Sequence, residues 1–521
     1  MSSRRRKHWG WGFEDQQPTP VQVRASAAEL GAHLGIKVGE VEDPVSLEAL
    51  QLAPPRLLPP PSLVDICSED THARASHALG KSYVDVMRGF RGQFHHPPDF
   101  VAQPRDEGDL ERVLEWCSAE AVAAVPFGGG TSVVGGVTPD VGSSFNGAIS
   151  IDLGELDRVL EVDPVSRSAR IQGGALGPPL ESQLGAHGLT LRHFPQSFEY
   201  STLGGWIATR AAGHFATVWT HIEDLVESVR AITPSGAWES RRLPGSGAGV
   251  SPDRMLAGSE GTLGVITEAW VRVQPRPSHR ASAGVRFTSF EAGVDCVRAL
   301  SQSGLHPANC RLLDPGEAAL TLAGDGSHAL LVLGFESTDH PVDSSMARAL
   351  ELCREHGGIL PSSKGGSDSG DGVSSWREAF LGAPYMRDLM IAMGVLAETF
   401  ETAITWERFG AFHEGVKAAT EQAVREHCGE GGESSVASPT STPTAPPPTS
   451  PCSLPPAAER RSSSGGPSSR PPPRPSSSWE APSPTTMPSG AITGPGMTAS
   501  GPSPLPPPCA GRRRRWTPLA S

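Results

Sequence analysis

The segment that decides the fold is Pro126-Phe127-Gly128-Gly129-Gly130-Thr131-Ser132-Val133, which directly follows a short apolar strand candidate. Three consecutive glycines allow positive φ angles and let the backbone come close to a ligand. Successive N–H groups in such a turn can hold an anion, and two hydroxyls add donors for a pyrophosphate. The spacing matches neither the Rossmann pattern nor the P-loop. Taken alone, the segment fits an ordinary glycine-rich turn equally well.

Two further glycine-rich segments follow along the chain. One is PQSFEYSTLGGW at residues 195–206, continued by ATRAAG at 208–213, and the other is AGSEGTLGVIT at 257–267. Both are rich in small and hydroxyl residues, which suit close contact with a dinucleotide. Because each of the three turns lies beside an apolar strand candidate, coincidence is a poor explanation of the pattern.

Together the three segments resemble the FAD-binding domain of the vanillyl-alcohol oxidase and p-cresol methylhydroxylase superfamily. The resemblance implies FAD held between two α/β subdomains, under a cap domain that binds substrate. Residues 127–132 contain no histidine, so it implies non-covalent FAD. The cofactor-binding residues that it implies are Pro126, Gly128, Gly129, Gly130, Thr131, Ser132, Val133, Gln196, Ser197, Ser201, Thr202, Gly204, Gly205, Thr209, Arg210, Glu260, Gly261, Thr262, Gly264, Val265 and Ile266.

Motifs outside the glycine segments narrow the choice within this superfamily. HWGWG at residues 8–12, THIEDLV at 220–226, YMRDL at 385–389 and ETFETA at 398–403 resemble the alkyldihydroxyacetonephosphate synthase family. The resemblance covers about residues 8–428. Relatives that oxidise D-lactate or glycolate share the flavin segments, but not the tryptophan-rich start.

The family's reaction replaces the acyl chain of acyl-dihydroxyacetone phosphate by a long-chain alcohol, with no net oxidation. Such a reaction needs a cation for the phosphate, a base, and an apolar path for the chain. The resemblance implies that Arg387 binds the phosphate and, less directly, Arg230, since a guanidinium suits phosphate. For each arginine the alternative is an ordinary ion pair. We expect His193, His214 and His221, near the flavin segments, to be packing or surface residues.

The chain departs from the family after about residue 432. The family's Tyr-Phe pair and His-His-His loop are missing, and a tail rich in Pro and Ser takes their place, with 23 of the 50 prolines. When back-translated codons are read from their third base, residues 484–495 can give HHHAVGRDHRP. Residues 436–458 can give RLTHVYPDGAAPYFTVLAPAR, which carries the missing pair. The third base of each original codon is a free choice, whereas the second and third bases of each shifted codon are fixed by the residues of this chain. The C-terminal part is therefore interpreted as frameshifted, and a natural disordered tail is the alternative.

The overall organisation predicted is an α+β fold with a two-subdomain FAD-binding domain, an α/β cap domain and a disordered C-terminal tail. The predicted boundaries are 1–95 for an N-terminal extension, 96–277 for the FAD-binding domain, 278–430 for an incomplete cap and 431–521 for the tail. Helices are expected at 26–34, 107–119, 290–302, 341–356 and 406–427, and strands at 123–127, 148–152, 168–172, 265–273, 283–287 and 329–335. Residues 362–375 are expected to form an exposed loop.

Composition limits the partners. The net charge of −13 argues against non-specific binding to nucleic acid. No stretch is apolar enough to span a membrane or to act as a secretory signal. The eight cysteines lack metal-binding spacing, so no metal is predicted and free thiols in the cytoplasm are expected. The remaining expectations are a small lipid substrate, peripheral membrane contact for access to the acyl chain, and a homodimer.

Three hypotheses for function remain. The first is an FAD enzyme that resembles alkyldihydroxyacetonephosphate synthase. The second is an FAD-dependent dehydrogenase of 2-hydroxyacids such as D-lactate or glycolate. The third is a flavin-binding remnant without catalysis, because the tail lacks the base. Ether product would establish the first, flavin reduction by D-lactate or glycolate the second, and bound flavin with neither activity the third.

Overall fold

The computed structural model describes residues 5–34, 38–215, 221–243, 250–321, 323–360, 378 and 382–428. These residues all fall within one compact unit of the chain. The predicted loop at 362–375 and the predicted disordered tail at 431–521 lie outside the described residues.

A small sheet carries the first glycine segment at the end of its strand β3 (Val122–Phe127). Its strand order is β1-β2-β4-β3, with β1 at Cys67–Ser68, β2 at Val101–Ala102 and β4 at Gly147–Asp152. Strand β4 pairs in parallel with both β2 and β3. Helix α4 (Glu107–Ala119) connects β2 to β3 and starts at Asp106, whose side chain accepts a hydrogen bond from the N3 amide. Its apolar face packs on the sheet, because Leu110 and Val113 are fully buried against Ile149 and Ile151.

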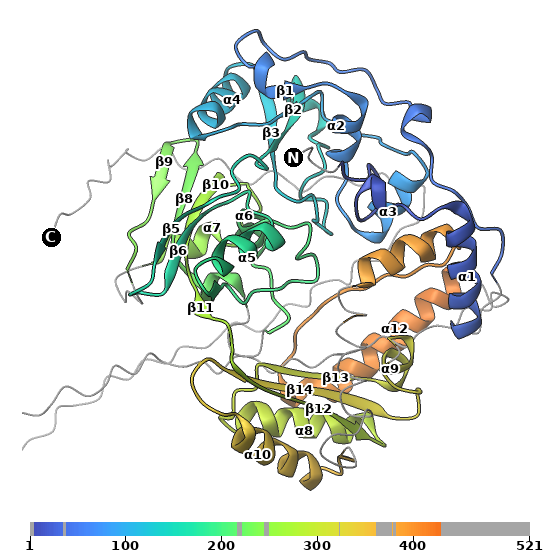
Figure 1. Cartoon of the computed structure of the whole chain (residues 1–521). Helices are drawn as coiled ribbons and strands as arrows, with labels where there is room; N and C mark the ends of the chain where they lie inside the picture. Colours follow the sequence, from blue (N-terminus) through green and yellow to red (C-terminus); the bar gives the residue numbers. More distant parts are fainter. Residues whose placement is uncertain are drawn as a thin grey trace, which may run out of the picture. The chain divides into compact units, whose positions relative to one another are not determined.

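A second, antiparallel sheet has the order β5-β6-β10-β8-β9. Its strands are β5 (Val159–Asp163), β6 (Ser168–Gln172), β10 (Val265–Arg272), β8 (Val226–Thr233) and β9 (Gly236–Glu239). Helices α5 (Gly177–Gly185) and α6 (Leu203–Thr209) cover one face, and α7 (Asp253–Leu256) precedes β10 (Figure 1). Trp206 and Leu180 are buried there against Ile171. Strands β7 (Leu189–Thr190) and β11 (Gln274–Pro275) pair in a separate two-stranded antiparallel sheet.

The third sheet belongs to the predicted cap and has the order β12-β14-β13. Its strands are β12 (His279–Phe287), β14 (Ala329–Ser337) and β13 (Asn309–Leu313). Helices α8 (Phe290–Gln302) and α10 (Asp343–Glu355) lie on one face and α9 (Pro315–Leu320) on the other (Figure 1). A helical stretch at 382–392 and helix α12 (Phe409–Cys428), preceded by the 3-10 turn η6 (Trp406–Arg408), follow.

The N-terminal region contains helices α1 (Pro20–Leu34), α2 (Thr71–Ser76) and α3 (Tyr83–Phe90). The remaining short turns are η1 (Glu14–Gln16), η2 (Leu47–Ala49), η3 (Val64–Ile66), η4 (Gly142–Ser144) and η5 (Ile222–Asp224). The tryptophan-rich start is buried, with Trp9 edge-on to Phe90 and Trp11 edge-on to Tyr200. The start of the chain therefore packs on the second glycine segment.

The predicted fold class, α+β, is confirmed, and α4, α8 and β6 have the predicted bounds. Helix α1 begins at Pro20, six residues earlier than predicted, because proline is well suited to the first turn of a helix. None of the described helices is long and apolar enough to cross a membrane. The described residues hold no group of three or more side chains arranged to bind a metal. The described cysteines include five free thiols.

Candidate flavin and substrate site

The first two glycine segments lie against each other. A Cβ at Gly129 would overlap the carbonyl oxygen of Tyr200, and one at Gly128 would overlap the hydroxyl of Thr202. Gly130 has a φ of +67°, a conformation that side chains other than glycine rarely adopt. The three glycines are thus required by a close approach of two backbones and by a left-handed turn.

The third glycine segment reaches the same place. Gly261, at a φ of +83°, lies over Pro126, whose Cγ would be 2.9 Å from a Cβ at this glycine. The amide of Glu260 donates to the carbonyl of Ala208 at 2.9 Å, and the amide of Gly258 donates to that of Ile207 at 3.1 Å. All three predicted segments therefore converge, which sequence alone could only suggest.

Several predicted cofactor residues use their side chains within the protein. The Thr202 hydroxyl accepts from the amide of Gly205 and caps α6, and the Ser201 hydroxyl accepts from the Trp206 indole at 2.6 Å. Arg210 pairs with Glu223 at 2.6 Å. These residues can approach a cofactor mainly through their backbone. The side chains of Val265 and Ile266 are buried in the two subdomain cores, so the same holds for them.

The first glycine segment remains the part best suited to a pyrophosphate. Thr131 and Ser132 are half-buried. Among the residues that the structure describes, Ser132 Oγ accepts from two local amides, those of Gly136 at 3.0 Å and Val134 at 3.4 Å. The loop presents backbone amides in a turn that contains a left-handed glycine. The donor set of amides and hydroxyls therefore fits FAD. The individual cofactor contacts remain predictions.

Arg387 stands beside a buried carboxylate. It lies on the helical stretch 382–392, is half-buried, and makes no hydrogen bond or ion pair with any residue that the structure describes. Burial lowers its pKa, and Asp388 and Glu398 raise it. Asp388 Oδ2 accepts from the amide of Trp11 at 2.8 Å and lies 3.9 Å from Lys7 Nζ. A guanidinium with unused donors in this setting can bind an anion.

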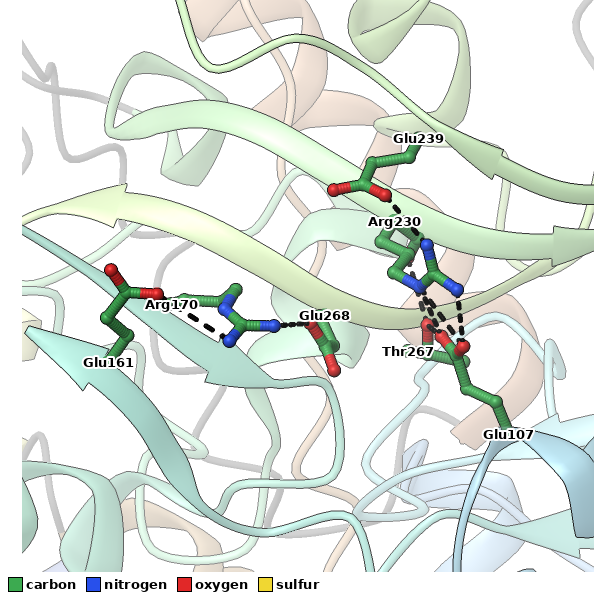
Figure 2. Close-up of polar contacts among 7 residues, drawn as sticks. All are labelled: Glu107, Glu161, Arg170, Arg230, Glu239, Thr267 and Glu268. Carbon is green, nitrogen blue, oxygen red and sulfur yellow. Dashed lines mark hydrogen bonds and ion pairs between the residues drawn. The ribbon is translucent and has the colours of Figure 1, made fainter.

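Arg230 has very different surroundings, which Figure 2 shows. Its guanidinium donates to both oxygens of Glu107 at 2.7–3.0 Å and to Glu239 at 2.7 Å, while the Thr267 hydroxyl also donates to Glu107. Glu107 belongs to α4 of the first subdomain, whereas Arg230 and Thr267 lie on strands of the second sheet. These contacts support a structural brace between the subdomains and give no support to the predicted phosphate role.

A cavity of about 330 Å³ lies beside this brace. Its lining is largely charged and includes Arg105, Arg158, Glu107 and Glu268. It contains none of the residues predicted to bind FAD or phosphate. We therefore do not assign it to the flavin.

The three histidines near the flavin segments differ in their surroundings. His193 is buried against Trp206, and burial lowers its pKa to about 4, with a smaller effect of His221. His214, which directly follows the second glycine segment, has its Nε2 2.9 Å from the side-chain amide nitrogen of Asn309 on β13, so this contact ties the end of the segment to the cap sheet. The packing role expected for His193 and His214 agrees with these contacts.

Some charged residues of the site were missed from the sequence. Lys7 and Lys81 interact with Asp388, and in the cap Arg311 on β13 interacts with Glu317 on α9. Burial raises the pKa of Glu317 to about 7, with Arg311 opposing the shift and Asp314 adding to it. A lone lysine or arginine carries no sequence signal of its own, because only the fold shows that it is drawn away from solvent.

Residues 98–240 match the family described as FAD binding domain, and residues 276–432 match the C-terminal domain of FAD linked oxidases. The second match ends at residue 432, where the Pro- and Ser-rich tail begins. The first match contains the first two glycine segments and Arg230, and the second contains Arg387. The segment 257–267 lies between the two matches.

The alkyldihydroxyacetonephosphate synthase of Trypanosoma brucei brucei is 31% identical over 393 residues, which are 69% of this chain and 63% of the relative. That of Dictyostelium discoideum is 32% identical over 370 residues, 66% of this chain and 59% of the relative. A crystal structure of an alkyldihydroxyacetonephosphate synthase superposes with a TM-score of 0.69 at 28% identity, over 81% of this chain and 84% of the other. A glycolate oxidase subunit of Bacillus subtilis is more distant, at 25% identity.

The chain matches about three fifths of the length of these curated relatives. It is a flavoprotein with both domains of the FAD linked oxidases, it is a homologue of the alkyldihydroxyacetonephosphate synthases, and FAD is its cofactor.

Proposed function

We propose that this protein acts on an acyl-dihydroxyacetone phosphate and exchanges its acyl group for a fatty alcohol, which forms an ether lipid precursor. FAD, when bound, supplies the electron-deficient ring system on which this exchange depends. The relatives with the strongest likeness in sequence and fold carry the name of this synthase. The 2-hydroxyacid dehydrogenase alternative has weaker support from the more distant relatives.

The observation that carries the proposal is the setting of Arg387. A phosphate monoester carries about −1.5 to −2 charges and accepts hydrogen bonds in a fork geometry that a guanidinium can match. Arg387 offers such a guanidinium without a partner among the described residues. It lies next to Asp388, which ties its helix to the start of the chain through Trp11. Arg387 would hold the phosphate and thereby orient the acyl-bearing carbon of the substrate.

Exposed apolar side chains flank Arg387 in the sequence, and such side chains suit contact with a long aliphatic chain. Met386, Leu396, Phe400 and Ile404 are all exposed, by 41%, 57%, 61% and 38%. Large exposed apolar residues that gather in one segment mark a binding surface for a ligand, a membrane or another protein segment. We infer that the acyl and alkyl chains run along this surface, and that peripheral membrane contact gives them access to it.

We also propose that FAD is held without a covalent bond. Residues 127–132 contain no histidine, and His77, whose ring lies 4.1 Å from that of Phe127, has both ring nitrogens in use. Its Nδ1 lies 2.8 Å from the carbonyl oxygen of Ala73 and its Nε2 lies 3.2 Å from Asp152. A histidine so engaged is not available for attachment to the flavin ring.

The catalytic base is not assigned to any described residue. Tyr385 donates to Glu199 at 2.8 Å and shares a 2.9 Å hydrogen bond with Tyr200, but burial and these two neighbours raise its pKa, which opposes a role as base. If the frameshift interpretation holds, the base lies in the peptide that the shifted frame encodes. The chain as written would then bind FAD and substrate yet form at most traces of ether. A homodimer and a cytoplasmic location also remain proposals.

The test uses the full chain loaded with FAD, an acyl-dihydroxyacetone phosphate and an isotope-labelled fatty alcohol, with mass spectrometry of the lipid products. The frame-restored chain serves as the comparison. Labelled ether product from the restored chain supports the proposal. Reduction of the flavin by D-lactate or glycolate, without ether product, would replace it by the dehydrogenase alternative.

A further inference from the structure

Three cationic side chains interact with one buried carboxylate. Asp388 is buried and interacts with Lys7, Lys81 and Arg387, all of which favour its charged form. Burial nevertheless raises the pKa of Asp388 to about 6. Lys7 is itself buried and lies 3.9 Å from Asp388 Oδ2, so this lysine already has its partner. Two cations, Lys81 and Arg387, are left to share the same carboxylate.

Lys81 is held at this place by its backbone. Its amide donates to the carbonyl of Ser132 at 2.7 Å, and a Cβ at the preceding Gly80 would overlap the same carbonyl. Because the N–H and C=O of a trans peptide point in opposite directions, Lys81 stands on the carbonyl side of this peptide. The backbone of Lys81 is thus anchored to the first glycine segment.

The ammonium group of Lys81 is poorly satisfied. Its one hydrogen bond among the described residues goes to the carbonyl of Trp9 at 3.4 Å. The second carboxylate that faces it, Asp85, is engaged in the capping box of α3 with Ser82. Neither Lys81 nor Arg387 is completely buried, since each keeps part of its surface exposed to solvent.

We propose that Lys81 is a substrate-binding residue, and that its ammonium and the guanidinium of Arg387 together hold one phosphate monoester dianion. This inference rests on the proposed function and names the second cation of its phosphate subsite. Asp388 is a positioning residue, because it accepts a hydrogen bond from the Trp11 amide and so anchors the helix of Arg387. A bound dianion supplies negative charge that balances the two cations.

The affinity of this subsite for phosphate should depend on pH. Burial lowers the pKa of Lys81 to about 8. The charged groups that face it are Asp388 and Asp85, which favour its protonated form, and Arg6, Arg387 and His8, which oppose it. Phosphate binding requires protonated Lys81, so affinity is full well below about pH 8 and falls as the pH rises through this value.

The experiment is isothermal titration of the FAD-loaded full chain with dihydroxyacetone phosphate and, separately, with sulfate, which stays a dianion across the pH range. Lys81→Met is expected to raise the Kd of dihydroxyacetone phosphate about tenfold or more near neutral pH, because a charge-assisted contact is lost. Lys81→Arg should keep the affinity and remove the loss around pH 8. The control is Arg88→Met, which removes an exposed charge of α3 and should change the Kd by less than about threefold.

Equal Kd values for Lys81→Met and Arg88→Met overturn the inference, and so does a parallel loss of FAD and phosphate, which would make Lys81 a support of the flavin loop. Binding of sulfate that depends on Lys81, without binding of dihydroxyacetone phosphate, supports the anion subsite and overturns the proposed substrate. A wild-type chain that keeps FAD and binds neither anion overturns the inference.

Discussion

The brace at Arg230 allows a prediction that separates a structural from a substrate-binding arginine. The change is Arg230→Met, which keeps most of the side-chain volume and removes the charge. It breaks the two-pronged contact with Glu107 and the contact with Glu239, and leaves Glu107 with the hydroxyl of Thr267. The side chains of Arg230 and Glu107 are 32% and 25% exposed, so solvent screens part of the interaction.

The free energy of unfolding should fall by about 1–2 kcal/mol. This loss lies between that expected for an exposed ion pair and that for a charged group left unpaired in a protein interior. For a domain of this size, about 2–4 °C of Tm is lost per kcal/mol, so the Tm should fall by about 2–8 °C. Because the brace joins the two subdomains that converge on the glycine segments, the Kd of FAD should rise by up to about tenfold. The affinity for dihydroxyacetone phosphate at saturating FAD should not change.

The matched control is Arg170→Met. Arg170 is 37% exposed and pairs with Glu268 at 3.1 Å and Glu161 at 3.6 Å, but both partners lie on its own sheet (Figure 2). This control should lose less than about 1 kcal/mol and keep its affinity for FAD. Scanning calorimetry and flavin titration measure both quantities. An Arg230→Met chain that matches the control in both would refute the brace, and a selective loss of phosphate binding would restore the substrate role.

The brace also has an expected pH dependence. Burial would raise the pKa of Glu107, but the hydrogen bonds from Arg230 and Thr267 outweigh it and the pKa is lowered. A carboxylate with a lowered pKa stabilises the fold above its unfolded pKa, and this contribution is lost as the pH falls through the folded value. The Tm difference between wild type and Arg230→Met should therefore be full near neutral pH and fade below about pH 4.

Three other changes test other parts of the site. Acid precipitation of the yellow protein should release free FAD into the supernatant, and colour that stays with the pellet would show a covalent bond. Arg387→Ala should raise the Kd of dihydroxyacetone phosphate by about tenfold or more, because a charge-assisted contact is lost, and should leave the Kd of FAD unchanged. Equal loss of affinity for both ligands in titrations would make this arginine structural. Gly129→Ala places a Cβ on the carbonyl oxygen of Tyr200, so the flavin-to-protein absorbance ratio should collapse, whereas Gly39→Ala, where the added Cβ meets nothing within 4 Å, should keep it.

Much of the fold could be predicted from local pattern. The bounds of helices α4 and α8 can be predicted from the sequence, because each helix has an Asp or Ser cap followed by apolar residues at helical spacing. The glycine segments were found because three rare motifs in one order specify a family, and the structure then explained them by the backbone contact between Gly129 and Tyr200. Sequence thus predicted which segments matter.

Pairing between distant side chains could not be predicted. Arg230 and Arg387 have the same chemistry in the sequence, yet one contacts Glu107, 123 residues away, and the other has no partner among the described residues. Burial lowers the pKa of Lys81, and Asp388, which lies more than 300 positions further along the chain, opposes this shift. Such encounters depend on the packing of whole elements, which no local periodicity encodes.

The most direct test of the central claim is formation of a labelled alkyl ether from acyl-dihydroxyacetone phosphate and a labelled fatty alcohol by the FAD-loaded, frame-restored chain. The coding DNA across codons 428–440 is sequenced first to define that frame. We predict ether product that contains the label, with at most traces from the chain as written. No ether product from the restored chain, together with bleaching of its flavin by D-lactate or glycolate, would contradict the account.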